Sequence, residues 1–185
     1  MMNKPLLAAA PVIETERLRL RPLKASDLQA FCDLWNEPAV YHYITKKPLS
    51  VEEHWGRIMR LVGQWPLVGY GSWAVTEKAS DKFIGQCGFM FLHREMDHPM
   101  PEPEIGWALS GRCHGKGLGF EATSAALTWF DQQFDIKQTA CIIDPTNVPS
   151  QKLAAKLGYK LAAKTTYKED PVWLFHRQRG VNSPQ

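Results

Sequence analysis

The spacing of hydrophobic positions changes along the first half of the chain, and each spacing predicts an element. Residues Arg17 to Leu23 alternate polar and apolar side chains, which is typical of a strand with one buried face. Apolar residues then recur at helical spacing between Leu28 and Trp35, after a cap at Ser26 or Asp27 and before Glu37-Pro38, which we expect to end the helix. Between this helix and the next, YHYITKKP reads as an aromatic loop.

A second helix is predicted after Ser50 and Glu53, which have the spacing of a capping box. The segments GSWAVTE and KFIGQCGFMFL are rich in residues that favour strands, and the turn-like KASD between them predicts an antiparallel hairpin. The proline-rich HREMDHPMPEP that follows reads as a loop.

The stretch from Glu104 to Asp144 reads as strand, glycine loop, helix and strand. The strands are EIGWAL and TACIID, and the helix is GFEATSAALTWFDQQF, with a broad apolar stripe. Such a unit requires a right-handed crossover and parallel pairing of its two strands. NVPSQKLAAKLGY then predicts a short helix, from Asn147 to Gly158, and strands are expected near YKLAAKTTY and PVWLFHR.

Together these elements predict an α+β fold. We expect a single domain over residues 14–178, with a mixed, mostly antiparallel sheet, one parallel β-α-β crossover and helices on both faces. Residues 1–13 are expected to form a flexible N-terminus, and residues 179–185 a polar C-terminal tail.

Composition excludes several classes of function. The chain has 185 residues and a net charge of +3 without a dense basic run, so nucleic acid is not an expected partner. The four cysteines lie far apart, which favours free thiols in a reducing compartment over a zinc site or a disulfide framework. The histidines lack metal-ligand spacing, so we expect them to be solvated, and no metal is predicted. The apolar run near the N-terminus is shorter than a membrane span, and a cytoplasmic protein is expected.

The segment RCHGKGLGFEA, from Arg112 to Ala122, is the strongest candidate for chemistry. Closely spaced glycines before a helix allow backbone N–H groups to approach a phosphate. A P-loop is excluded, because Ser110 and Gly117 stand where that motif needs glycine and a hydroxyl residue. A dinucleotide fingerprint matches Gly117, Gly119 and Ala122, but it does not follow the first strand of the domain, so it stays a weaker alternative.

The same segment also carries the pattern R-x-x-G-x-G between a strand and a long helix. With DPTNVPS after the next strand and KLGY beyond it, this resembles the GNAT superfamily of acetyl-CoA-dependent N-acetyltransferases. The resemblance covers nearly the whole chain. The segments ETERLRLRPL, NEPAVYHYIT, FIGQCGF and EIGWAL are similar to the branch containing the ribosomal-protein alanine N-acetyltransferases of the RimJ/RimL type.

The resemblance implies a site for acetyl-CoA and no metal. It places the pyrophosphate against the backbone of the glycine loop, with two basic side chains alongside: Arg112, His114, Gly115, Lys116, Gly117, Leu118 and Gly119. It places the pantetheine arm against the main chain of a splayed strand and one asparagine: Trp107, Ala108, Leu109 and Asn147.

The resemblance also implies catalytic roles. Glu104 is the expected base, and Ser150 is expected to donate to the leaving thiolate. Both residues have simpler interpretations, as a surface charge and as a solvated first-turn serine. Some relatives use a tyrosine in the following helix as the acid, but Ala154 and Ala155 stand there, so the identity of the acid stays open.

We expect the acceptor amine to bind between the aromatic loop, with Tyr41 and Tyr43, and the acidic loop before Glu104. The acceptor is a protein N-terminal α-amine or a small-molecule amine, and the chain is a monomer or a homodimer. The favoured function is transfer of an acetyl group from acetyl-CoA to a primary amine. The alternative is a CoA-binding sensor or interaction module without turnover.

Overall fold

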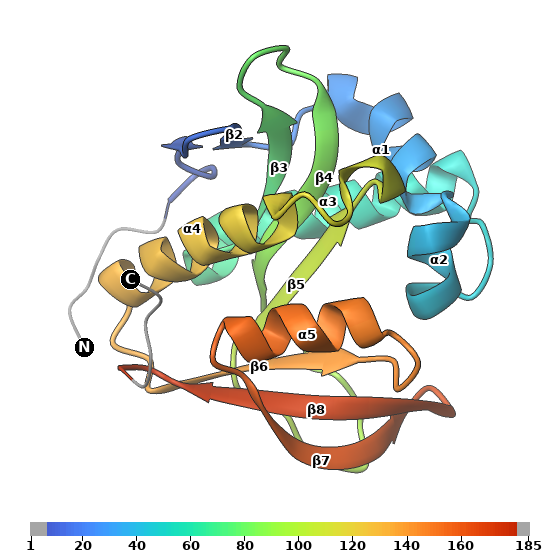
Figure 1. Cartoon of the computed structure of the whole chain (residues 1–185), viewed down its shortest axis with the longest axis vertical. Coiled ribbons are helices and arrows are strands. Elements are labelled where there is room, and N and C mark those ends of the chain that lie inside the picture. The colour runs from blue at the N-terminus through green and yellow to red at the C-terminus, as the bar shows by residue number, and fades with distance from the viewer. Residues whose placement is uncertain (1–6, 181–185) are drawn as a thin grey trace.

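The computed structural model describes residues 7–180 (Figure 1). Residues 1–6 and 181–185, parts of the expected flexible start and polar tail, lie outside the described residues. The helices are α1 (Leu28–Trp35), α2 (Pro38–Ile44), α3 (Val51–Val68), α4 (Leu118–Gln133) and α5 (Val148–Lys156). The strands are β1 (Ile13–Glu14), β2 (Leu18–Arg21), β3 (Ser72–Glu77), β4 (Phe83–Met90), β5 (Glu104–Leu109), β6 (Gln138–Ile143), β7 (Lys160–Tyr167) and β8 (Asp170–Gln178).

The described strands form one 8-stranded sheet in the order β1-β2-β3-β4-β5-β6-β8-β7. Neighbouring strands are antiparallel except β5 and β6, which α4 connects as a crossover. The register of β5 and β6 contains one pair, Glu104 opposite Ala140, so the two strands part beyond it. The predicted α+β fold with one parallel crossover is confirmed, and the parting of β5 from β6 opens the sheet at its centre.

Helices cover both faces of the sheet, as predicted (Figure 1). On one face, α1 and α3 bury side chains such as Phe31, Ile58 and Leu61 against Ala74 and Ala108. On the other face, α4 and α5 pack against the sheet through two clusters of buried residues. Because helices pack on both faces of the sheet, the main chain of β5 lies in the interior of the protein.

The first half of the region expected to be an aromatic loop is helical, because α2 extends to Ile44, so that prediction was wrong for residues 41–44 and holds for the residues after them. Pro38 stands in the first turn of α2, and Glu37 before it has an extended backbone. Proline is favoured at the first helical position, because the N–H that it lacks would have no partner there. Pro38 therefore begins a new helix directly after α1, and Tyr41 and Tyr43 belong to α2.

The capping box of Ser50 and Glu53 is confirmed at the start of α3. The next residue, His54, is fully buried, so the prediction of solvated histidines was wrong for this one. Its Nε2 lies 3.1 Å from Oδ1 of Asn36, a hydrogen-bond acceptor that also binds the N–H of Leu49. Burial, with the nearby charge of Arg57, lowers the pKa of His54 below its ordinary value.

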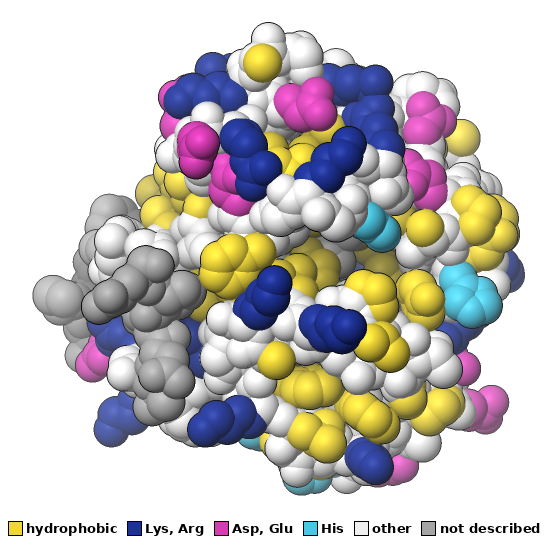
Figure 2. All heavy atoms as spheres, in the orientation of Figure 1, with side chains coloured by type: hydrophobic (Ala, Val, Ile, Leu, Met, Phe, Trp, Pro, Cys, Tyr) yellow, Lys and Arg dark blue, Asp and Glu magenta, His cyan; other side chains and the backbone are white. Residues whose placement is uncertain are grey.

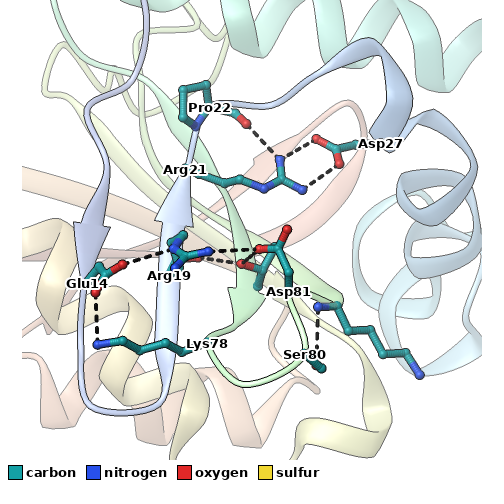
Figure 3. A network of polar contacts seen from close by, with 10 residues as sticks. Glu14, Arg19, Arg21, Pro22, Asp27, Lys78, Ser80 and Asp81 are labelled. Atoms are coloured by element: carbon teal, nitrogen blue, oxygen red, sulfur yellow. Dashed lines mark hydrogen bonds and ion pairs between the residues drawn. The ribbon is translucent and has the colours of Figure 1, made fainter.

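A network of charged residues ties β2 to its neighbours (Figure 3). Arg19 bonds to Glu14 on β1 and Asp81 in the β3–β4 turn. Arg21 forms a two-bond ion pair with Asp27, with both distances 2.8 Å. Asp27 makes no side-chain bond to α1, because its carboxylate is used by Arg21 and by the N–H of Lys24. The expected cap of α1 therefore anchors the β2–α1 connection.

Candidate active site

Two cavities meet where β5 parts from β6. The larger, about 420 Å³, extends from the glycine loop between α4 and α5, and the smaller, about 200 Å³, lies beside the start of β5. Five residues line both: Tyr43, Ile44, Trp107, Asn147 and Ser150. Figure 2 shows a hollow on the face that carries α4 and α5, with hydrophobic side chains in its floor and Lys and Arg side chains along its edges.

The glycine loop leads directly into α4. Gly115 and Gly117 have φ angles of 72° and 76°, a conformation that other residues resist, and Gly117 is the N-cap of α4. The N–H groups of the first helical turn have no partner within the helix, and the helix dipole is positive at this end. The loop therefore presents unpaired N–H groups to an anion.

Arg17, which was not predicted as a site residue, lies directly before β2 and contacts this loop. Its Nη1 donates to the main-chain oxygen of Lys116 at 2.9 Å, and it forms an ion pair with Glu121 at 2.7 Å. Thr15 also donates to Glu121, at 2.6 Å. The alternation near Arg17 indicated a strand only, and nothing in the pattern pointed to a contact about a hundred residues away.

The structure brings most of the predicted cofactor residues together around the larger cavity: Trp107, Ala108, Leu109, His114, Gly115, Gly117, Gly119, Asn147 and Ser150. Three others do not line it. Arg112 donates to the main-chain oxygen of Phe83 at 3.1 Å, Lys116 is exposed, and Leu118 is buried in the core. The expected roles of Arg112 and Lys116 beside a pyrophosphate stay predictions.

Ser150 lies where the two cavities join, and its polar groups are ordered by two neighbours. Its N–H donates to Oδ1 of Asn147 at 3.1 Å, so Asn147 caps α5 as predicted. Nε1 of Trp107 donates to Oγ of Ser150 at 3.3 Å. Because an indole N–H is only a donor, the hydroxyl accepts here and keeps its own hydrogen for another partner.

Glu104 lies in the wall of the smaller cavity and is 4% exposed, so the interpretation as a surface charge does not hold. Both of its oxygens accept hydrogen bonds from Arg94, at 2.6 and 2.9 Å. Burial alone would lower the pKa of Arg94, but its contacts with Glu104 and Tyr167 raise it above the ordinary value. The guanidinium carbon of Arg94 lies 4.6 Å from the ring centre of Tyr167.

Of the residues expected to hold the acceptor, Tyr43 lines both cavities, whereas Tyr41 lines neither. Two of the acidic residues before β5 are used elsewhere, because Asp97 accepts from Thr166 and Glu102 accepts from Gln138. The other charged residues of the smaller cavity were not predicted, because they are scattered along the sequence without a common pattern: Lys46, Arg57, Arg60, Arg94, Asp144 and Asp170.

Within residues 7–180, no group of three or more His, Cys, Asp or Glu residues is arranged to hold a metal ion. The four cysteines, all in this range, are free and buried. None of the described helices is long and apolar enough to cross a membrane.

The chain is similar to known proteins over most of its length. Residues 17–160 match the family model for the acetyltransferase (GNAT) domain. The chain is 26% identical over 147 residues to the N-acetyltransferase p20 of Bacillus licheniformis, covering 79% of this chain and 80% of that protein. It is 28% identical over 171 residues to YkkB of Bacillus subtilis, covering 89% and 94% of the two chains.

Solved structures share the fold. An acetyltransferase from Agrobacterium tumefaciens superposes with a TM-score of 0.80 at 24% identity, over 92% of this chain and 96% of that one. RimL, a ribosomal L7/L12 α-N-protein acetyltransferase solved in complex with coenzyme A, superposes with a TM-score of 0.74 at 16% identity, over 93% and 100%. The chain therefore belongs to the GNAT family of acetyltransferases and is an N-acetyltransferase.

Proposed function

We propose that this enzyme transfers the acetyl group of acetyl-CoA directly to a primary amine, with both substrates bound at once. The observation that carries the proposal is the junction of the two cavities at Trp107, Asn147 and Ser150. Acetyl-CoA occupies the larger cavity and the amine enters through the smaller one, so the thioester and the nitrogen meet at these residues. Holding two reactants in this way removes much of the entropic barrier to their reaction.

The larger cavity suits the cofactor in both charge and shape. The unpaired N–H groups at the start of α4 receive the pyrophosphate, because charge-assisted hydrogen bonds from backbone N–H groups are strong. Beyond Glu104 and Ala140 the register of β5 and β6 ends, which leaves main chain of β5 available to the pantetheine arm. Leu153 and Phe120 add apolar contacts from α5 and α4.

Ser150 serves as the proton donor to the sulfur in this proposal. When the C–N bond forms and the C–S bond breaks, the departing thiolate needs a proton. The hydroxyl of Ser150 supplies it, since its oxygen already accepts a hydrogen bond from Trp107 and its hydrogen is free to point toward the sulfur. Solvent then restores the proton on Ser150.

Glu104 serves as the base that takes a proton from the ammonium group of the acceptor, directly or through a water molecule, and so leaves the neutral amine that attacks the thioester. Each carboxylate oxygen has two lone pairs, so the bonds from Arg94 leave one on each oxygen for this purpose. Arg94 holds the carboxylate in one orientation beside the cavity. Tyr43, at the junction, contributes to the wall against which the acceptor packs.

A thiol-release assay with purified protein and acetyl-CoA tests the function. The acceptors are small amines, amino acids and short peptides with free N-termini, each at matched concentration. We expect at least one acceptor to release thiol and N-acetylated product in equal amounts. Tight binding of acetyl-CoA without amine-dependent thiol release from any acceptor would instead support the CoA-binding module.

A further inference from the structure

The charges around the smaller cavity are not all neutralised within the described chain. Two of its cations form ion pairs with carboxylates: Arg94 with Glu104, and Lys46 with Asp144. Arg57 and Arg60, which lie on α3 and line the same cavity, form no ion pair with the described residues. Asp170, the remaining acidic residue of the lining, is exposed on β8.

Arg57 is held in place without a partner for its charge. Its guanidinium carbon lies 3.9 Å from the ring centre of Trp35, which also lines the cavity. Nη1 of Arg57 and Nε1 of Trp35 are both buried, and neither finds an acceptor in the described part of the chain. Buried donors in proteins are nearly always hydrogen-bonded. Two unpaired donors in the wall of one cavity therefore indicate that an acceptor is missing.

The protonation state of Arg57 agrees with this interpretation. Burial, with repulsion from Arg60 and Arg94, lowers the pKa of Arg57 to about 10. It therefore stays protonated at neutral pH and keeps its charge in a poorly solvated position. An anion bound beside it would restore the interactions that burial removed.

We infer that the acceptor carries a carboxylate near its amine, and that Arg57, with Arg60 beside it, binds this carboxylate. The inference rests on the proposed function and names its substrate class: amino acids and similar small amino carboxylates. A carboxylate presents acceptor oxygens in a plane that matches a guanidinium fork. The nearby indole N–H of Trp35 offers a further donor.

Size and charge favour this class over the other amines. A cavity of about 200 Å³ is smaller than the range typical of drug-sized ligands, which begins at about 300 Å³. The unpaired arginines repel an acceptor with several positive charges, such as a polyamine. They also favour the neutral form of a nearby amine, which is the form that attacks a thioester.

Binding of the product tests the inference without relying on turnover. The protein is saturated with CoA and titrated with each of the common N-acetyl-L-amino acids and with the primary amide of each. The indole N–H signal of Trp35, assigned with Trp35→Phe, is followed in ¹H–¹⁵N spectra. We expect at least one carboxylate to shift this signal, its amide to bind at least tenfold more weakly, and Arg57→Gln to remove the difference.

Arg19→Gln is the matched control, since Arg19 is an arginine with two ion pairs on β2, away from the cavity. It should leave the preference for the carboxylate unchanged. If Arg57→Gln does not fold, as judged by thermal unfolding, Arg57→Lys and Arg60→Gln replace it, and each should reduce the preference. Failure of every N-acetyl amino acid to shift the Trp35 signal would overturn the inference.

Kinetics separate this inference from the proposed function. If the wild-type enzyme acetylates amino acids at least tenfold better than their amides, and Arg57→Gln removes that preference, both the substrate class and the proposed function are supported. If it acetylates amides or peptide N-termini equally well, the substrate class is wrong and the acetyl transfer stands. If carboxylates bind at Arg57 but no amine is acetylated, the anion site stands and the proposed function fails.

Discussion

At the scale of single residues, the contact between Trp107 and Ser150 changes how Ser150 is interpreted. Its main-chain N–H is capped by Asn147, and its hydroxyl is not needed for that cap. The hydroxyl instead accepts from Trp107 at the point where the two cavities meet. From the sequence alone, a solvated serine and a proton donor to the sulfur were equal alternatives. The hydrogen bond from Trp107 favours Ser150 as the proton donor.

Ser150→Ala should lower kcat by about 10²-fold, the lower end of the range for general acid catalysis. The KM for acetyl-CoA should change much less, because donation to the sulfur strengthens as the thiolate forms. Steady-state kinetics measure both constants. Ser150→Thr, which keeps a hydroxyl, should restore part of the rate. An unchanged kcat in Ser150→Ala would leave the residue with a structural role only.

Glu104→Gln should lower kcat/KM by about 10²-fold or more near neutrality, because glutamine keeps the shape but cannot accept the amine proton. Part of the loss should be recovered at high pH, where free amine is abundant. Rates measured across pH show both effects. The substitution also removes the charge partner of Arg94, so a control is needed for its effect on thermal stability.

Asp131→Asn provides that control. It removes the carboxylate partner of another buried arginine, Arg177, whose side chain is 1% exposed. Neither Asp131 nor Arg177 lines the cavities. Comparable loss of thermal stability in the two variants, with loss of activity only in Glu104→Gln, is the expected result. A Glu104→Gln enzyme with the parent's rate and pH profile would show that another group takes the proton.

At the scale of elements, the features that could be predicted are those that depend on residues close together in the sequence. The capping box of α3, the β3–β4 hairpin and the glycine loop before α4 each have local patterns, and each appears in the structure. The start of α2 was misread because proline ends one helix and begins another equally well. Asp27 was misread because an arginine on the preceding strand, Arg21, can compete with a helix for a capping carboxylate.

The glycine loop also shows which substitution can probe the larger cavity without distorting the fold. Gly115 and Gly117 have positive φ angles, so any side chain there strains the backbone as well as filling space. Gly119 lies inside α4 and lines the larger cavity, and a Cβ there would meet Cδ2 of Leu153 at 3.4 Å, an ordinary contact. An alanine at this position therefore adds a methyl group to the cavity with little strain.

At the scale of the whole molecule, the site could be predicted only in part. The motifs predicted most of the residues that line the larger cavity, because these residues come from β5, the glycine loop and the start of α5, whose patterns can be recognised in the sequence. The charged residues of the smaller cavity come from α3, from the loops after α2 and before β5, from the end of β6 and from the starts of β5 and β8, and only the folded chain brings them together. The ion pair of Glu104 with Arg94 and the unpaired Arg57 are therefore findings of the structure.

The central claim is that acetyl-CoA lies in the larger cavity, against the start of α4. Calorimetry of acetyl-CoA binding to the parent protein, Gly119→Ala and Gly56→Ala tests it most directly. Gly56 lies in α3, and a Cβ there meets nothing within 4 Å, so Gly56→Ala should bind acetyl-CoA as the parent does. Gly119→Ala should bind at least tenfold more weakly, about 1.4 kcal/mol, while unfolding at a temperature close to the parent's. Equal affinity in all three folded proteins would contradict the account.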